Sequence, residues 1–293
     1  MNATLARLPS AEGLYLKAAS TVLRRPKGRP RIPQYGVQVR GVRVSAQQLS
    51  EYRKVCGFGD SHTLPITFPH VMAAALHLQL MTQPQFPLPL LGLVHVRNRI
   101  EQLRGLGTGE SYDFDVRIGE AREARQGLEF DIVSSVSVDG AEIWNEVMTT
   151  LFRIPGPKPP AARPAPAPAS LSEYIPIDAP ADIGRRYAKV GKDFNPIHLA
   201  PLPARLFGFK RHIAHGMWSV AHGAALLEDR VEGEPTLLDV QFRQPLFLPG
   251  RAALKFAHNA DAGRKAFDSS RRDIEFAMLS RISDKVHLSG TLR

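Results

Sequence analysis

One short stretch of the sequence, GKDFNPIHLA at 191–200, contains side chains that could move protons. Asp193 and His198 lie five residues apart, so on a curved loop they could flank one water molecule as a general acid–base pair. Asn195 lies between them, and its amide can hold that water or fix the loop. Pro196 restricts the backbone beside it. The same residue types are common in plain turns, so the surrounding elements must decide between structure and chemistry.

An apolar segment follows this loop. GMWSVAHGAALLED, at 216–229, places bulky and small apolar residues on nearly all helical faces. This pattern is typical of a helix buried inside a domain. His215 immediately precedes the segment and could either serve a site or simply pack the start of the helix.

The length of 293 residues favours two domains. A Pro/Ala-rich stretch, PGPKPPAARPAPAPAS at 155–170, cannot pack as a helix or a central strand and is typical of a semi-rigid linker. It separates an N-terminal part, 1–154, from a C-terminal part, 171–293.

The two parts resemble each other in order and periodicity. Three pairs of segments correspond: YRKVCGFGD (52–60) and YAKVGKD (187–193), PHVMAAAL (69–76) and AHGMWSVA (214–221), LLGLVHVRNRI (90–100) and LLDVQFRQPL (237–246). The offset within each pair is similar, which indicates an internal duplication. In each copy a polar loop, an apolar helix and several strands follow in the same order. We therefore expect one long helix wrapped by an antiparallel sheet in each copy.

The first copy lacks the polar set. After Gly59 and Asp60 it continues as SHTLPITF, without a D-x-N-P-x-H arrangement. If those residues only shaped a turn, both copies would have a similar use for them. Their presence in one copy alone favours a functional site.

Composition narrows the partners and the compartment. The net charge of +10 favours an anionic partner, such as nucleic acid, an acidic membrane surface or a phosphate-bearing molecule. The basic run RRPKGRPR at 24–31 has no interleaved aromatic residues and is broken by prolines, which favours a solvated tether over a nucleic-acid arm. Cys56 is the single cysteine, which excludes an intramolecular disulfide and a Cys-rich zinc site and favours a reducing cytosol. Neither a signal peptide nor a membrane span is expected.

Three segments, YAKVGKDFNPIHL, HIAHGMWSVA and VQFRQPLFLPG, resemble the MaoC-like dehydratases, also called type 2 or (R)-specific enoyl-CoA hydratases, in their double-hotdog form. The resemblance covers about 180–293. It implies an α+β fold in which each half is a hotdog, a long central helix wrapped by an antiparallel β-sheet. It also implies that 1–154 is a degenerate hotdog that houses the acyl chain and carries no catalytic motif.

The resemblance implies roles for the loop and the helix start. Asp193 and His198 would activate water for attack on C3 of a 2-enoyl thioester, and Asn195 would hold that water or the loop. The amide of Gly216 would stabilise the charge that develops on the carbonyl oxygen. The implied substrate-binding residues are Lys192, Pro196, His215, Met217, Arg205, Lys210 and Arg211. The last three could receive phosphates of the carrier, although any one of them could equally be solvated surface.

Two positions depart from the family pattern. Gly191-Lys192 stands where the family usually has Ser-Gly, and a cation beside Asp193 would favour the carboxylate or reach a substrate phosphate. Leu199-Ala200 stands where an acidic residue often follows His-x.

The sequence therefore predicts a cytoplasmic hydro-lyase that reversibly hydrates 2-enoyl thioesters of coenzyme A or acyl carrier protein to (R)-3-hydroxyacyl thioesters in fatty acid metabolism. We expect no metal, and no cofactor beyond the coenzyme A or phosphopantetheine that the substrate carries. We expect no nucleic-acid partner and no membrane insertion, in a monomer or a homodimer. A hotdog acyl-CoA thioesterase and a non-catalytic acyl-thioester-binding protein are the alternatives, with nucleic-acid binding a distant third.

Overall fold

The computed structural model describes residues 2–24, 26, 30–90, 92–154, 171–259, 273–283 and 285–293. Its helices are α1 (Ala11–Ser20), α2 (Ala46–Cys56), α3 (Phe68–Thr82), α4 (Ile183–Gly191), α5 (Pro196–Leu199), α6 (Pro201–Leu206) and α7 (Gly216–Leu227), with 3-10 turns η1 (Thr21–Leu23) and η2 (Glu228–Arg230). Its strands are β1 (Asn2–Leu5), β2 (Gly36–Arg43), β3 (Leu93–Gln102), β4 (Ser111–Ala124), β5 (Gly127–Val138), β6 (Ala141–Arg153), β7 (Glu173–Ala179), β8 (Leu237–Phe242), β9 (Gly250–Asn259), β10 (Asp273–Ser280) and β11 (Val286–Leu292). The predicted linker, 155–170, lies outside the described residues.

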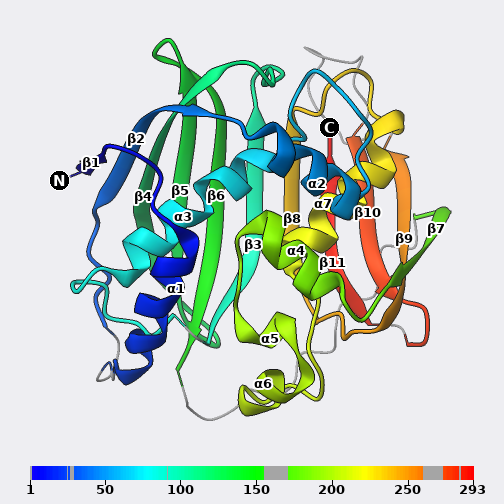
Figure 1. Ribbon diagram of the computed structural model, residues 1–293. Coiled ribbons are helices and arrows are strands. Elements are labelled where there is room, and N and C mark those ends of the chain that lie inside the picture. The colour runs from blue at the N-terminus through cyan, green and yellow to red at the C-terminus, as the bar shows by residue number, and fades with distance from the viewer. Residues whose placement is uncertain are drawn as a thin grey trace.

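All of these strands form one sheet, in the order β1-β2-β4-β5-β6-β3-β8-β11-β10-β9-β7. Neighbouring strands are antiparallel, except that β1 runs parallel to β2 at one edge. The strands before residue 154 fill one side of the sheet and those after 171 fill the other (Figure 1). The two sides meet where β3 pairs with β8, with Arg97 opposite Gln241. The matched segments 90–100 and 237–246 thus pair with each other.

Each half has a central helix. Figure 1 shows α3 crossing the first part of the sheet and α7 crossing the second part. Both helices are buried on most faces, as their mixture of small and bulky apolar residues predicts. Buried residues of the two halves, among them Trp144 and Phe256, belong to one continuous core. The predicted double arrangement of helix and wrapped sheet is confirmed.

The segments expected to be polar loops before each central helix contain helices instead. Residues 52–56 end α2, and 187–191 end α4. Both helices terminate in a left-handed residue, Gly57 with φ 90° after α2 and Lys192 with φ 56° after α4. A terminal left-handed residue releases the chain from the helix toward the central helix or the polar loop. We predicted loops because these segments are rich in polar residues, which lie on the exposed faces of amphipathic helices.

The basic run at 24–31 is not entirely a solvated tether, because its first residue is fixed in the fold. The Arg24 guanidinium donates hydrogen bonds to carbonyl groups at and beyond the C-terminus of α3. The acceptors are the carbonyl oxygens of Met81, Thr82, Gln83 and Leu88, at 2.9–3.2 Å. Arg24 therefore caps the central helix, which otherwise ends with unpaired carbonyl groups.

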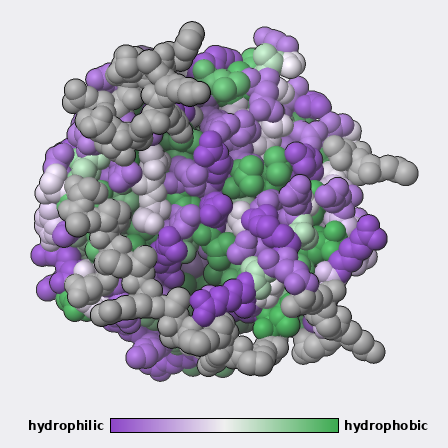
Figure 2. Space-filling view, turned by 180° about the vertical axis from the view of Figure 1, so that it is seen from behind, coloured by the Kyte–Doolittle hydropathy of each residue, from purple (hydrophilic) through white to green (hydrophobic). Residues whose placement is uncertain are grey.

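The face of the molecule behind the sheet is mixed in polarity. Viewed from that side, hydrophilic residues surround separate small hydrophobic patches (Figure 2). Strands β4 and β5 explain this pattern, because buried and more exposed residues alternate along much of each strand. Among the described residues, the helices are all too short or too polar to cross a membrane.

Candidate active site

The loop after α4 is held by local hydrogen bonds. Asn195 caps α5, since its side-chain oxygen accepts from the amide of Ile197 at 3.4 Å, and Pro196 occupies the first helical position. The Asp193 carboxylate accepts from the amide of Asn195 at 3.0 Å. Gly184 of α4 lets this loop approach closely, because a Cβ there would collide with the carbonyl of His198. The motif therefore shapes the loop and also orients its charged side chain.

The predicted acid–base pair comes together. Oδ2 of Asp193 lies 4.0 Å from Nε2 of His198. His198 donates from Nδ1 to the carbonyl of Ile213 at 2.9 Å, so Nε2 of the neutral ring carries a lone pair. His215 donates from Nε2 to the carbonyl of Asp193 at 2.9 Å, and its ring stacks on His198 with centroids 3.8 Å apart. Two hydrogen-bond acceptors thus face a gap that one water molecule can bridge.

The N-terminal helix α1 adds a residue that no sequence motif marks. The Tyr15 hydroxyl donates to Oδ1 of Asp193 at 2.7 Å, across 178 residues of chain. Its ring lies edge-on to Phe194 at 5.8 Å. Burial and the neighbouring carboxylate raise the pKa of Tyr15, so the hydroxyl stays protonated and acts as a donor. Because Oδ1 is occupied by Tyr15 and the Asn195 amide, Oδ2 is the oxygen left to act on water.

The charges of the site favour base chemistry. Burial opposes the charged form of Asp193, but His215, His198 and the hydrogen bond from Tyr15 outweigh burial and lower its pKa to about 2. Burial, aided by His198, lowers the pKa of His215 to about 3, and burial lowers the pKa of His198 as well. At neutral pH the site therefore holds one carboxylate beside two neutral imidazoles.

Gly216 opens α7 next to this pair. His215 is the N-cap residue, so the first amide groups of the helix have no partner within the helix. A Cβ at Gly216 would lie 2.8 Å from the ring of Phe242, so a larger residue would push that ring or the helix start away. Gly216 and Met217 both line the cavity described next. An amide at the positive end of a buried helix is suited to a developing oxyanion.

A cavity of about 1010 Å³ joins the two halves. On one side it is lined by the loop and the start of α7, including Asp193, Asn195, His198, His215 and Gly216. On the other side it is lined by the first half, including Ala74, Leu78, Met81, Leu93 and Leu151. The first half also contributes charged lining residues, among them Arg97, Arg122, Arg125, Glu129 and Arg153. The cavity therefore extends from the polar loop into the half that lacks the motif, where its wall is partly apolar and partly charged.

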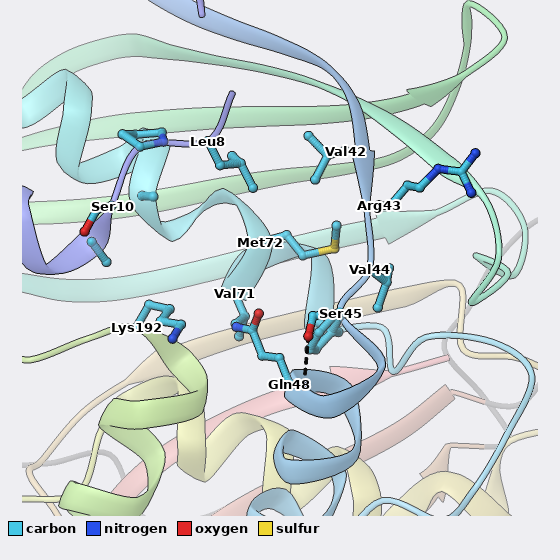
Figure 3. Close-up of a pocket in the computed structure, with 14 residues that line it drawn as sticks. Leu8, Ser10, Val42, Arg43, Val44, Ser45, Gln48, Val71, Met72 and Lys192 are labelled. Atoms are coloured by element: carbon cyan, nitrogen blue, oxygen red, sulfur yellow. Dashed lines mark hydrogen bonds between the residues drawn. The ribbon is translucent and has the colours of Figure 1, made fainter. Parts of the chain in front are cut away.

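The predicted cationic residues lie at the edge of the site. Arg205, Lys210 and Arg211 are exposed and do not line the cavity, but Phe207 and Phe209 between them do. Lys192 lines this cavity and also a smaller pocket of about 230 Å³, where its side chain lies beside Val71 and Gln48 (Figure 3). No ion pair joins Lys192 to Asp193 in the part of the chain that the structure describes.

The first half contributes a polar group that the sequence analysis missed. His70 and His77 of α3 line the cavity, and both approach the buried Glu146 of β6. A signal was present, because His70-x6-His77 repeats His215-x6-His222 of the second copy. Two groups, His70/His77/Glu146 and Asp193/His198/His215, bring ligand atoms close enough together to hold a metal ion. For the second group, the hydrogen bonds already described account for the arrangement without one.

Comparisons with known proteins identify relatives of this chain in sequence and in fold. The sequence profile of the MaoC like domain matches residues 161–274. The chain is 34% identical over 256 residues to 3-hydroxyacyl-thioester dehydratase X of Mycobacterium tuberculosis, covering 85% of this chain and 89% of that protein. A crystal structure of HtdX from that organism has a TM-score of 0.73 at 30% identity, covering 88% and 99% of the two chains. A MaoC-like dehydratase of Phytophthora capsici shares the fold, with a TM-score of 0.71 at 15% identity over 89% and 95%.

Proposed function

The chain belongs to the MaoC-like dehydratase family, and we propose that it interconverts 2-enoyl and (R)-3-hydroxyacyl thioesters by adding and removing water. It is a hydro-lyase. The observation that carries the proposal is the pair of free acceptors, Oδ2 of Asp193 and Nε2 of His198, 4.0 Å apart beside the start of α7. The name of the Mycobacterium tuberculosis relative gives a 3-hydroxyacyl thioester as the substrate of that protein.

Water activation follows from the two acceptors. A water between them donates one hydrogen bond to Asp193 and one to His198, which leaves an oxygen lone pair free to attack C3. As the new C–O bond forms, Nε2 of His198 takes a proton, and the electrons of the double bond move onto the thioester oxygen. The enolate then takes that proton at C2. Dehydration follows the same steps in reverse.

The start of α7 stabilises the enolate. The Gly216 amide and the helix dipole meet the oxygen where negative charge develops. Loss of one such donor typically lowers kcat by about 10²–10³. The tight packing of Gly216 against Phe242 fixes where that amide points.

Carrier binding belongs to the cationic edge. The phosphates of coenzyme A or of a phosphopantetheine arm would be received by Lys192, which lines the cavity, and by Arg205, Lys210 and Arg211, which are close in sequence to the cavity-lining Phe207 and Phe209. The apolar part of the cavity, in the first half, would take the acyl chain. The buried free thiol of Cys56 is compatible with the reducing cytoplasm in which we place the enzyme.

The test is direct. Purified protein is mixed with a short and a long trans-2-enoyl-CoA, and the loss of conjugated enoyl absorbance is followed, with chiral analysis of the product. We expect loss of absorbance and formation of the (R)-3-hydroxy product. Release of free thiol without hydration would instead identify a thioesterase, and saturable binding without any turnover would identify a binding protein.

A further inference from the structure

The first half lines the cavity with polar residues as well as apolar ones. We refer to His70, His77, Asn98, Ser134 and Glu146 as the His70 cluster. His70 bonds through Nδ1 to Oε1 of Glu146 at 2.7 Å, and Asn98 donates to the same oxygen at 2.6 Å. His77 bonds through Nε2 to the hydroxyl of Ser134 at 2.9 Å. The histidines line the cavity and Glu146 lies fully buried behind them.

The His70 cluster carries an ion pair. Burial opposes the charged form of His70, but the Glu146 carboxylate outweighs burial and raises the pKa of His70. Burial also opposes the charge on Glu146, and His70 nevertheless lowers the pKa of Glu146 to about 2. Since Nδ1 of His70 is bonded to Glu146, Nε2 is the donor that remains, and it has no hydrogen-bond partner among the described residues.

Such an arrangement is unexpected in the wall of a cavity that binds only hydrocarbon. Replacing a buried ion pair by apolar residues of similar volume is often neutral or stabilising. In addition, Oε2 of Glu146 and Oδ1 of Asn98 are buried without a hydrogen-bond partner among the described residues. A polar ligand group at His70 would give the cluster a use that an alkyl chain cannot give it.

The position of the His70 cluster along the cavity follows from α3. The His70 ring lies 6.3 Å from the ring of His95, which lies 4.7 Å from the Phe242 ring beside Gly216, so His70 lies on the side of the cavity toward the reacting carbons. His77 follows about two turns later on α3, and its ring centroid lies 5.3 Å from that of His70. Beyond it α3 contributes Leu78 and Met81. An acyl chain running along α3 would pass His70 before it reaches the apolar end.

We propose that the His70 cluster is a binding site for an oxygen atom on the acyl chain, a hydroxyl or a carbonyl group placed between the reacting carbons and the apolar end of the cavity. The inference rests on the proposed function and narrows its substrate class to oxygen-bearing acyl thioesters. Nε2 of His70 donates to that oxygen, and the adjacent Glu146 balances the charge. A neutral oxygen function fits this pair better than a carboxylate, because the cation is already neutralised.

The experiment uses matched pairs of 2-enoyl-CoA substrates of equal length, one plain and the others carrying a hydroxyl or keto group at successive positions along the chain. For the wild type we expect kcat/KM to be at least about tenfold higher for one oxygen position than for the plain chain, because a site built to hydrogen-bond a group discriminates against its absence. His70→Phe should abolish that preference. His222→Phe is the matched control, since His222 is the counterpart of His77 on α7, stacks on Trp218 and does not line the cavity. It should keep the preference.

A binding measurement separates this inference from the proposed reaction. Saturated acyl-CoAs with and without the oxygen group are titrated calorimetrically into the wild type, and the oxygen-bearing ligand should bind at least about tenfold more tightly. Should His70→Phe fail to fold, Glu146→Gln removes the charge that holds His70 protonated and should weaken the same preference.

The outcomes are distinct. Preferential binding without turnover would support the His70 cluster and overturn the proposed reaction. Turnover with equal kcat/KM and equal binding at every position would overturn the inference and leave the reaction standing. Zinc retained stoichiometrically by the purified chain and lost in Glu146→Gln would also overturn it, because the cluster would then be a metal site.

Discussion

Each central helix has a histidine at or within its first turn, and the two histidines have different partners. His215 at the start of α7 is neutral, donates to the backbone of Asp193 and stacks on His198. His70 in the first turn of α3 pairs with the carboxylate of Glu146, which favours the charged form of His70 and raises its pKa against the effect of burial. Beside His215 stands Gly216, whereas Val71 stands beside His70.

The difference shows how a duplicated scaffold can divide its work. The second half keeps free acceptors and a helix amide, which are the groups that water activation and enolate stabilisation require. The first half has its carboxylate already paired and buried, so it offers a donor to the cavity and no base. The two helices face one cavity, so one half can bind while the other reacts.

The largest effect is expected from the carboxylate of Asp193. Asp193→Asn keeps the shape of the side chain but removes its charge, so kcat should fall by about 10²–10⁴ while the melting temperature changes little. Stopped-flow or steady-state hydration assays measure this. Asp60→Asn is the matched control, because Asp60 is the counterpart in the first half and is exposed beside Arg53. Near-normal turnover of Asp193→Asn would remove that carboxylate from the mechanism.

Gly216→Ala should come next. The new methyl group meets the Phe242 ring and displaces the amide at the start of α7, so kcat should fall about tenfold or more. Gly223→Ala on the same helix is the control, since its Cβ would be at an ordinary 3.6 Å from Leu254. Equal kcat values for the two variants would show that the amide of Gly216 is not the oxyanion donor.

Tyr15→Phe tests the contribution of the N-terminal helix. Tyr15 helps to lower the pKa of Asp193, so its loss should raise that pKa and move the acidic limb of the kcat/KM profile to higher pH. Activity is lost as pH falls through this pKa, because the carboxylate must be charged. One hydrogen bond to a charged group is worth about 1.5–3 kcal/mol, so the pKa of Asp193 should rise from about 2 to about 3–4 and activity at neutral pH should change little. Tyr35→Phe, which loses only a bond to the carbonyl of Leu80, should leave the acidic limb in place.

Lys192→Gly is expected to have the smallest effect. Lys192 has a left-handed conformation where the first half has Gly57. A left-handed backbone conformation destabilises a residue that has a side chain by about 1–2 kcal/mol. Glycine avoids this penalty, but its greater conformational freedom in the unfolded state offsets part of the gain. The variant should therefore be more stable by about 0.5–1 kcal/mol in denaturant unfolding. Gly57→Lys should be less stable than the wild type, and the opposite pair of signs would contradict this account of α2 and α4.

Much of this site could be predicted because its residues are close in sequence. The D-x-N-P-x-H motif and His215-Gly216 lie within 25 residues, and their order indicated the family and the start of the central helix. The central helices and the strands of the sheet could be predicted because their apolar residues recur with the periods of a buried helix and of a β-strand. The helical character of α2 and α4 was missed because polar residues dominate their exposed faces.

The rest depends on contacts across long stretches of chain. Tyr15 reaches Asp193 across 178 residues, and Glu146 reaches His70 across 76. No local pattern marks either partner, and the pairing of β3 with β8 is what brings the halves into one cavity. The repeated His-x6-His spacing is visible in the sequence. It does not indicate a polar cluster, because the partner Glu146 is distant in sequence.

The central claim is that the second half reacts and the first half binds. It is tested most directly by measuring kcat and KM for His198→Ala and His70→Ala on one oxygen-bearing 2-enoyl-CoA, with folding checked by circular dichroism. The account predicts that His198→Ala lowers kcat by at least about 10², whereas His70→Ala mainly raises KM. An equal fall of kcat in both variants, with KM unchanged, would contradict it, because the first half would then take part in the chemistry.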